Sequence, residues 1–84
     1  MDDRRKKLLF RAWRRGFREI DLILGGFADR HLANLDENAL DALEALLQAP
    51  DQDVYAWIVG QSPPPPEFDT ALLAAIRADA GAGR

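Results

Sequence analysis

The chain has 84 residues, no cysteine and one histidine, so disulfides, thiolate metal sites and histidine-based catalytic triads lack the residues that they need. The longest charge-free stretch in the N-terminal half, residues 22–28, is far shorter than the ~20 apolar residues of a membrane span. Residues 1–18 carry a net charge of +6 and residues 19–84 carry −9, which indicates an electrostatically guided contact with an anionic partner.

Alanine and leucine dominate the composition and predict helices. Together they number 26, whereas valine, isoleucine and threonine number only seven. The length suits one domain, and no internal repeat is visible. We therefore expect an all-α fold, a compact single-domain bundle of about five short helices over residues 1–84, ordered from about 3 to 79 and frayed over 80–84.

A first helix is predicted over residues 3–14 and a second over residues 18–34. We expect Gly16 to end the first helix in the left-handed conformation. Gly25 and Gly26 lie inside the second helix, where they weaken it and predict close helix packing or a bend. The inward residues of the two helices are expected to be Leu8, Leu9, Ala12, Trp13, Ile20, Ile23, Leu24, Phe27 and a partly buried, structural His31.

A third helix is predicted over residues 37–48, with Asp36 as its N-cap and Pro50 beyond its end. A short fourth helix follows, capped by Asp51 or Asp53 and closed by Gly60. The residues expected to face inward are Leu40, Leu43 and Leu47 in the third helix and Val54, Trp57 and Ile58 in the fourth.

Four consecutive prolines within residues 62–66 predict an extended, stiff connector rather than a domain boundary. The last helix is predicted over residues 66–79. Its buried residues are expected to be Phe68, Leu72, Ala75 and Ile76.

The most distinctive segment, residues 14–21, joins the first two predicted helices. Gly16 lets the chain turn and leaves no side chain in the way of an approaching surface. The amides after it open a helix, so the positive end of the helix dipole lies near Arg14, Arg15 and the carboxylate of Glu19. This composition suits docking onto a polar, ligand-bearing surface. The alternative interpretation is ordinary helix-cap chemistry at Gly16 and Glu19.

The run Arg15-Gly16-Phe17-Arg18-Glu19, continuing to Asp21, resembles the Arg-Gly-x-x-Glu motif of the small FAD assembly factors of succinate dehydrogenase, the SdhE family. The resemblance covers about residues 4–77. The features that follow in the family's order are the basic first helix, the Leu35-Asp36 turn, the Leu46-Leu47 helix end and the Asp51–Gly60 segment with Trp57. The four-proline run, the Gly25-Gly26 pair and the alanine-rich tail depart from the family and lie outside the motif.

The resemblance implies that the chain binds the flavoprotein subunit of succinate dehydrogenase, and often that of fumarate reductase, and promotes covalent attachment of FAD to it. The bond-forming chemistry belongs to the flavin and the flavoprotein. The resemblance therefore implies a chaperone rather than an enzyme, acting on FAD that the partner holds and binding none stably itself. By position, Arg15, Gly16 and Glu19 are expected to face the flavoprotein near its FAD, with Arg14 and Asp21 in support.

Two neighbouring residues complete the candidate interface. Phe17 follows the turn glycine, so it is a candidate contact anchor, and Arg18 lies beside it in the motif. From the residues alone, most acidic side chains are interpreted as capping or solvated groups, and no metal site is expected.

The strongest alternative function is binding of nucleic acid or another anionic surface by residues 4–18, where aromatic side chains alternate with cations. It is disfavoured because the first helix needs its apolar residues for the core and the rest of the chain carries −9. A membrane-surface helix and an enzyme in its own right are less favoured still. No signal or transit segment is recognised, so we expect a protein of the bacterial cytoplasm.

Overall fold

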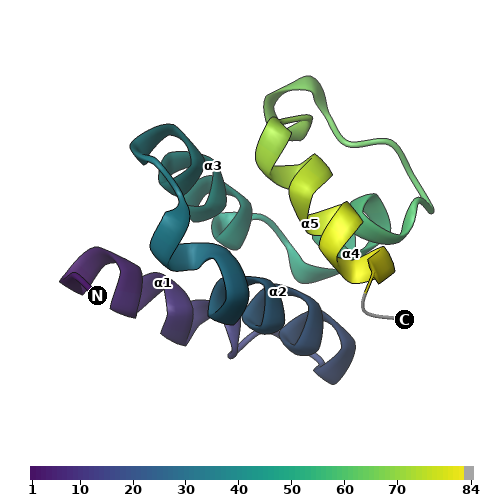
Figure 1. Cartoon of the computed structure of the whole chain (residues 1–84). Coiled ribbons are helices and arrows are strands. Elements are labelled where there is room, and N and C mark those ends of the chain that lie inside the picture. The colour runs from purple at the N-terminus through teal and green to yellow at the C-terminus, as the bar shows by residue number, and fades with distance from the viewer. Residues whose placement is uncertain (83–84) are drawn as a thin grey trace.

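The computed structural model describes residues 1–82, which form five α-helices and two 3₁₀ turns (Figure 1). This part of the chain contains no strand, so the predicted all-α fold is confirmed. The elements are α1 (Asp3–Ala12), α2 (Arg18–His31), η1 (Leu32–Asn34), α3 (Glu37–Gln48), α4 (Asp51–Val59), η2 (Pro66–Phe68) and α5 (Ala71–Ala82).

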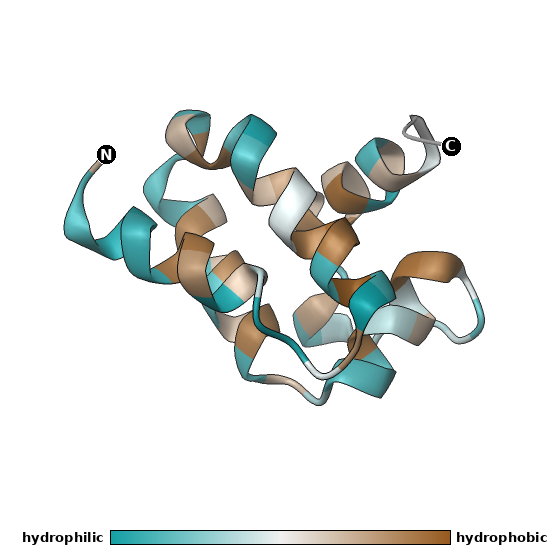
Figure 2. Cartoon of the chain, turned by 90° about the horizontal axis from the view of Figure 1, so that it is seen from below, coloured by the Kyte–Doolittle hydropathy of each residue, from teal (hydrophilic) through white to brown (hydrophobic). Residues whose placement is uncertain are grey.

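The core lies between the helices and collects apolar side chains from all five. Helix α1 packs against α2 and α3, and α5 packs against α2, α3 and α4. Figure 2 shows hydrophilic first turns in α1 and hydrophobic segments turned toward the space between the helices. The largest fully buried side chains are Leu8, Ile20, Leu24, Phe27, Leu32, Leu40, Leu43, Val54, Leu73 and Ile76.

Helix α1 ends at Ala12, two residues before the predicted end, and Trp13 is its C-cap in the right-handed region. The expectation that Gly16 is left-handed was wrong. Among the described residues only Gly60 has a positive φ, of 82°. The chain turns over residues 13–17, which we call the corner, and the reason for a glycine at position 16 is a close approach described below.

Close helix packing explains Gly25. A Cβ atom built there would lie 2.2 Å from Cδ2 of Trp13, so the indole occupies the space that a side chain would need. Trp13 is half-buried at the side of α2 rather than in the core, and its Nε1–H donates to Asp29 (3.3 Å). The prediction of close packing is confirmed, and the prediction of a core Trp13 was wrong because the indole covers the outside of α2.

The second helix is shorter than predicted. It ends at His31, and a 3₁₀ turn takes residues 32–34. His31 was expected to be partly buried, but its side chain is 46% exposed. Its ring packs on Phe27, with centroids 4.9 Å apart, and Nε2 lies 3.0 Å from an oxygen of Asp79 in α5. The polar partner draws the ring to the edge of the core.

The predicted third helix is confirmed in full. The Asp36 side chain accepts a hydrogen bond from the Ala39 N–H (2.8 Å), and the Leu40, Leu43 and Leu47 stripe is buried. In α4, neither aspartate is the N-cap, because the helix already begins at Asp51 after Pro50. Gly60 closes it in the left-handed conformation, as predicted.

The last helix begins at Ala71, five residues later than predicted. Pro66 opens a 3₁₀ turn instead, and the Thr70 hydroxyl then accepts from the Leu73 N–H (3.1 Å), which defines a new helix start. Phe68 is half-buried and stacks on Trp57, with centroids 5.0 Å apart, whereas Ala75 is exposed and Leu73 is buried in its place. Helix α5 continues to Ala82, and the fraying predicted over 80–84 falls in part on residues 83–84, outside the described residues.

Candidate partner-binding site

The corner is held by an ion pair between Arg15 and Asp51, the first residue of α4. Nε and a terminal nitrogen of Arg15 lie 2.8 Å and 2.7 Å from the same carboxylate oxygen, Oδ1. The same guanidinium also donates to the Ala49 carbonyl oxygen (3.4 Å). The side chain of Arg15 is only 12% exposed and that of Asp51 23%, so this pair is more shielded than a surface salt bridge.

Backbone amides of the corner are satisfied by two carboxylates. The Arg15 N–H donates to Oδ1 of Asp21 (2.6 Å), and the Gly16 N–H donates to Oδ2 of Asp51 (2.6 Å). The two oxygens of Asp51 are thus divided between a guanidinium and a backbone amide. Charge-assisted bonds of this kind are about twice as strong as neutral ones, so they fix the path of the corner.

Phe17 ties the same corner to α4 through an aromatic contact. Its ring meets Tyr55 edge to face, with centroids 5.2 Å apart. Asp51 and Tyr55 are four residues apart and lie on one face of α4, so a single helix face holds both Arg15 and Phe17. Phe17 is half-buried, which limits the anchor predicted for it to the exposed part of its ring.

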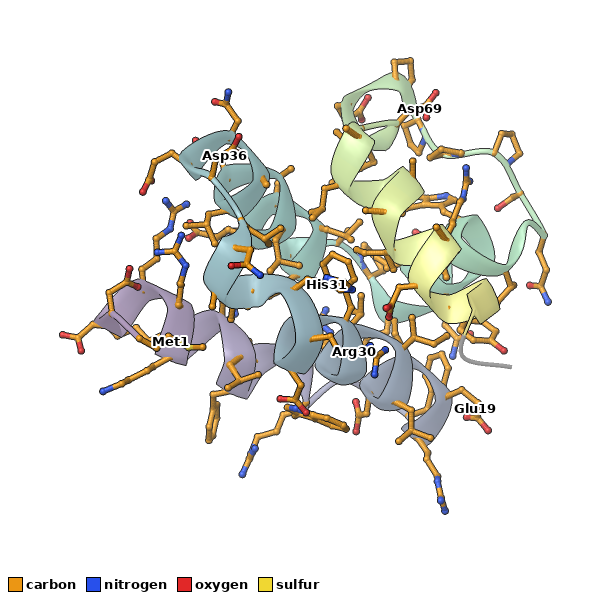
Figure 3. All side chains as sticks on the ribbon, viewed as in Figure 1. Met1, Glu19, Arg30, His31, Asp36 and Asp69 are labelled. Atoms are coloured by element: carbon orange, nitrogen blue, oxygen red, sulfur yellow. The ribbon has the colours of Figure 1, made fainter. Side chains whose placement is uncertain are left out.

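Within residues 14–21, the exposed residues are Arg14, Gly16, Arg18 and Glu19. The side chains of Arg18 and Glu19 form no hydrogen bond or ion pair with any residue of the described range 1–82. Figure 3 shows Glu19 at the outer end of α2, with its carboxylate directed away from the ribbon. These two charges are therefore available to another molecule.

One exposed apolar side chain lies beside Arg14 and another beside Glu19. Arg14 places its guanidinium 3.8 Å from the ring centroid of Phe10, which is 58% exposed. On the other side, Glu19 and Leu22, which is 51% exposed, border a surface hollow that continues to Tyr55 and the end of α5. Exposed apolar groups rimmed by charges are characteristic of a protein-binding surface.

Several cations of the basic head are committed within the molecule. Arg4 pairs with Glu37 and Asp41 of α3, at 2.9 Å and 2.6 Å. Arg5 pairs with Asp2 (2.6 Å) and also donates to two backbone carbonyls. With Arg15, three of the eight cations in residues 1–18 are engaged, and each of these pairs weakens the case for a nucleic-acid surface.

A second polar cluster joins the ends of α2 and α5. Asp79 accepts from the guanidinium of Arg30 and lies against His31. The hydrogen bond from Arg30, followed by that from His31, holds the pKa of the Asp79 carboxyl below its ordinary value, although burial opposes this shift. The cluster therefore stabilises the packing of α5 on α2 while the carboxylate is charged.

The structure brings the predicted site residues together, but in two groups. Arg14, Arg18 and Glu19 point outward, whereas Arg15 and Asp21 act within the corner. Two residues of α4 that also hold the corner, Asp51 and Tyr55, were not predicted as site residues from the sequence. The local pattern around Asp51, an acid after Pro50, indicated only a helix start, and no signal linked it to a residue 36 positions earlier.

Comparison with known proteins decides the family. The family model described as flavinator of succinate dehydrogenase (Sdh5) matches residues 6–80. The chain belongs to this family. The match includes the whole corner and every residue that holds it.

Named relatives of this flavinator family come from bacteria and from mitochondria. The FAD assembly factor SdhE of Legionella pneumophila is 40% identical over 68 residues, which cover 81% of this chain and 86% of the relative. The same factor of Acetobacter pasteurianus is 36% identical over 70 residues (83% and 64%). The mitochondrial succinate dehydrogenase assembly factor 2 of Dictyostelium discoideum is 41% identical over 73 residues (87% and 52%). The chain thus spans about half the length of the Dictyostelium relative.

No helix within residues 1–82 has the length and apolarity required to cross a membrane. No group of three or more His, Cys, Asp or Glu side chains in this range is arranged to hold a metal ion.

Proposed function

We propose that this chain is an assembly factor that binds the flavoprotein subunit of succinate dehydrogenase and promotes covalent attachment of FAD to it. Membership of the flavinator family supports this proposal. So does the exposed Glu19, which has no hydrogen-bond or ion-pair partner within residues 1–82 and follows a corner held by internal bonds. The FAD is held by the flavoprotein, and this chain binds none stably. It acts as a chaperone, and the bond-forming chemistry belongs to its partner.

The corner suits this role because the exposed charges that follow it, Arg18 and Glu19, extend from a backbone that is ordered without a partner. Internal bonds to Asp21 and Asp51 fix the backbone of Arg15 and Gly16, directly before α2, without any partner. Docking then orders few additional residues, which lowers the entropic cost of binding. Glu19 and Arg18 are the side chains proposed to arrange groups of the flavoprotein around the flavin attachment site.

We further propose a second client protein and a cellular location. The flavoprotein subunit of fumarate reductase is proposed as a second client, through the same corner. The bacterial cytoplasm is proposed as the location, supported by bacterial relatives named FAD assembly factor SdhE.

Co-expression with the cognate succinate dehydrogenase flavoprotein, in a host lacking its own assembly factor, tests the proposal. Covalent flavin is read by in-gel fluorescence, and binding is measured with the purified proteins. Glu19→Ala should weaken binding about tenfold, the effect of one interface residue worth ~1.4 kcal/mol. Glu67→Ala is the matched control, since Glu67 is also an exposed glutamate and lies in η2.

Circular dichroism completes the test because Glu19 lies in the first turn of a helix. The wild-type chain should raise covalent flavin, and Glu19→Ala should lower it with unchanged helical content. Equal flavin with and without the chain would refute the function proposed for this client. Unfolding of Glu19→Ala would assign the residue a structural role instead.

A further inference from the structure

The structure assigns Asp51 as the positioning residue of the corner. We infer that Arg15 and Gly16 act through Asp51, and that neither is a direct contact of the flavoprotein. Arg18 and Glu19, at the start of α2, are the exposed charges that directly follow this arrangement. The inference rests on the function proposed above and specifies how its binding site is built.

Within residues 1–82, the Asp51 carboxylate is the one group that bonds to both Arg15 and Gly16, the first two motif residues. Oδ1 accepts from the Arg15 guanidinium and Oδ2 from the Gly16 amide. The Arg15 side chain is only 12% exposed, and its Nε and one terminal nitrogen are already bonded to Asp51 and Ala49. Leaving a shielded carboxylate without its partner is costly, so docking that keeps the pair intact is favoured.

Gly16 is explained by the same carboxylate. A Cβ atom built at Gly16 would lie 2.6 Å from Oδ2 of Asp51, and its three nearest neighbours all belong to Asp51. The backbone of Gly16 is not in the left-handed region, so no strain of that kind requires glycine. A glycine is therefore required at position 16 because the Asp51 carboxylate must approach the Gly16 amide, and not because a partner occupies that space.

Helix α4 offers a matched control for Asp51. Asp53 lies in the same first turn, is exposed, and forms no side-chain hydrogen bond within residues 1–82. Substitution of either aspartate removes one negative charge from the N-terminus of α4, so the helix dipole is affected similarly. Of these two aspartates, only Asp51 contacts the corner. A difference in binding between the two variants therefore reports the positioning role.

A double-mutant cycle of Gly16→Ala and Asp51→Ala tests the inference. Binding to the flavoprotein is measured for the wild type, both single variants and the double variant, with Asp53→Ala alongside. Gly16→Ala should weaken binding by a factor of about 10 when Asp51 is present and by less than about 2 when position 51 is alanine. Asp53→Ala should bind as the wild type does. An equal cost of Gly16→Ala in both backgrounds would overturn the inference, because Gly16 would then face the partner directly.

Amide hydrogen exchange in the free chain provides a readout that does not depend on the partner. The Gly16 amide should lose protection in Asp51→Ala and retain it in Asp53→Ala. Protection that persists without Asp51 would overturn the positioning role. Asp51→Asn is the milder variant if Asp51→Ala does not fold, since asparagine replaces only one of the two carboxylate oxygens that Arg15 and Gly16 use.

The two proposals fail differently. A wild-type chain that neither binds the flavoprotein nor raises covalent flavin would refute the proposed function, while hydrogen exchange at Gly16 would still decide the role of Asp51. Normal flavinylation by the wild type, together with full activity of Asp51→Ala, would refute the positioning role alone.

Discussion

The six-membered ring of the Trp13 indole lies against the backbone of Gly25, at a point where α2 has no side chain. A Cβ atom added to Gly25 would come within 2.2–2.5 Å of three atoms of this ring. The indole is half-buried, and its N–H is bound to Asp29. The contact fixes the first residue of the corner, Trp13, on α2, so the position of the corner depends on the glycine.

Gly25→Ala should therefore destabilise the protein although alanine favours helix. The gain in helix propensity is about 1 kcal/mol, whereas forcing an extra methyl into a packed site costs about 1–3 kcal/mol and displaces the indole as well. We expect a net loss of about 1–2 kcal/mol in urea unfolding, with a shift in tryptophan fluorescence.

Gly26, the neighbour of Gly25, provides the control for this variant. The three atoms nearest to a Cβ built at Gly26 all belong to the guanidinium of Arg30, the nearest at 3.1 Å, and that flexible group can move by a few tenths of an ångström. Gly26→Ala should be neutral or stabilising by up to about 1 kcal/mol. Equal effects at the two glycines would contradict the role assigned to Trp13.

Arg15→Lys should weaken the corner although it preserves the charge. The guanidinium uses two nitrogens on Asp51 and reaches the Ala49 carbonyl, an arrangement that one ammonium group cannot reproduce. We expect the free energy of unfolding to fall by about 1–2 kcal/mol. Arg18→Lys, at an exposed position, should change it by less than about 0.5 kcal/mol. Chemical denaturation of both variants is the measurement, and equal stabilities would speak against the assigned geometry.

Acid should loosen α5 from α2 through Asp79. Because folding lowers the pKa of this carboxyl, the unfolded chain binds more protons near its ordinary pKa of about 3.9. The contribution to stability is complete above that value and is lost as pH falls through the lower, folded pKa. Asp79→Asn should thus flatten the dependence of unfolding free energy on pH between about 5 and about 2.

Arg30→Gln provides the companion variant for this pH series. It removes the hydrogen bond that lowers the Asp79 pKa most, so it should flatten the same profile to a smaller degree because His31 remains. If both variants kept the wild-type dependence of unfolding free energy on pH, the cluster would not contribute to the acid transition.

Nucleic acid should bind weakly and without specificity. Five cations of the basic head are outside the ion pairs described for residues 1–82: Lys6, Lys7, Arg11, Arg14 and Arg18. At about 0.7 per phosphate contact, five contacts give a salt slope no steeper than about −3.5 on a single strand. Fluorescence anisotropy with a labelled oligonucleotide at several salt concentrations measures it. Tight binding that survives physiological salt would restore the nucleic-acid interpretation.

Sequence alone determined the features that arise within a few residues of chain. Asp36 caps α3 by accepting a hydrogen bond from the Ala39 amide, three residues away. Gly60 closes α4, and the leucine stripe of α3 is buried. Each depends on backbone geometry or on the helical repeat, both of which are local. The motif and its family were also readable, because they are carried by contiguous residue types.

Tertiary structure alone decided which motif residues face outward. Arg15 meets Asp51 across 36 positions, and His31 meets Asp79 across 48. Neither pairing has a local signal, because it arises only after α4 and α5 have packed against the first two helices. Arg15 and Asp21 form their bonds inside the folded protein. Arg18 and Glu19 have no such partner within residues 1–82 and remain available for another protein.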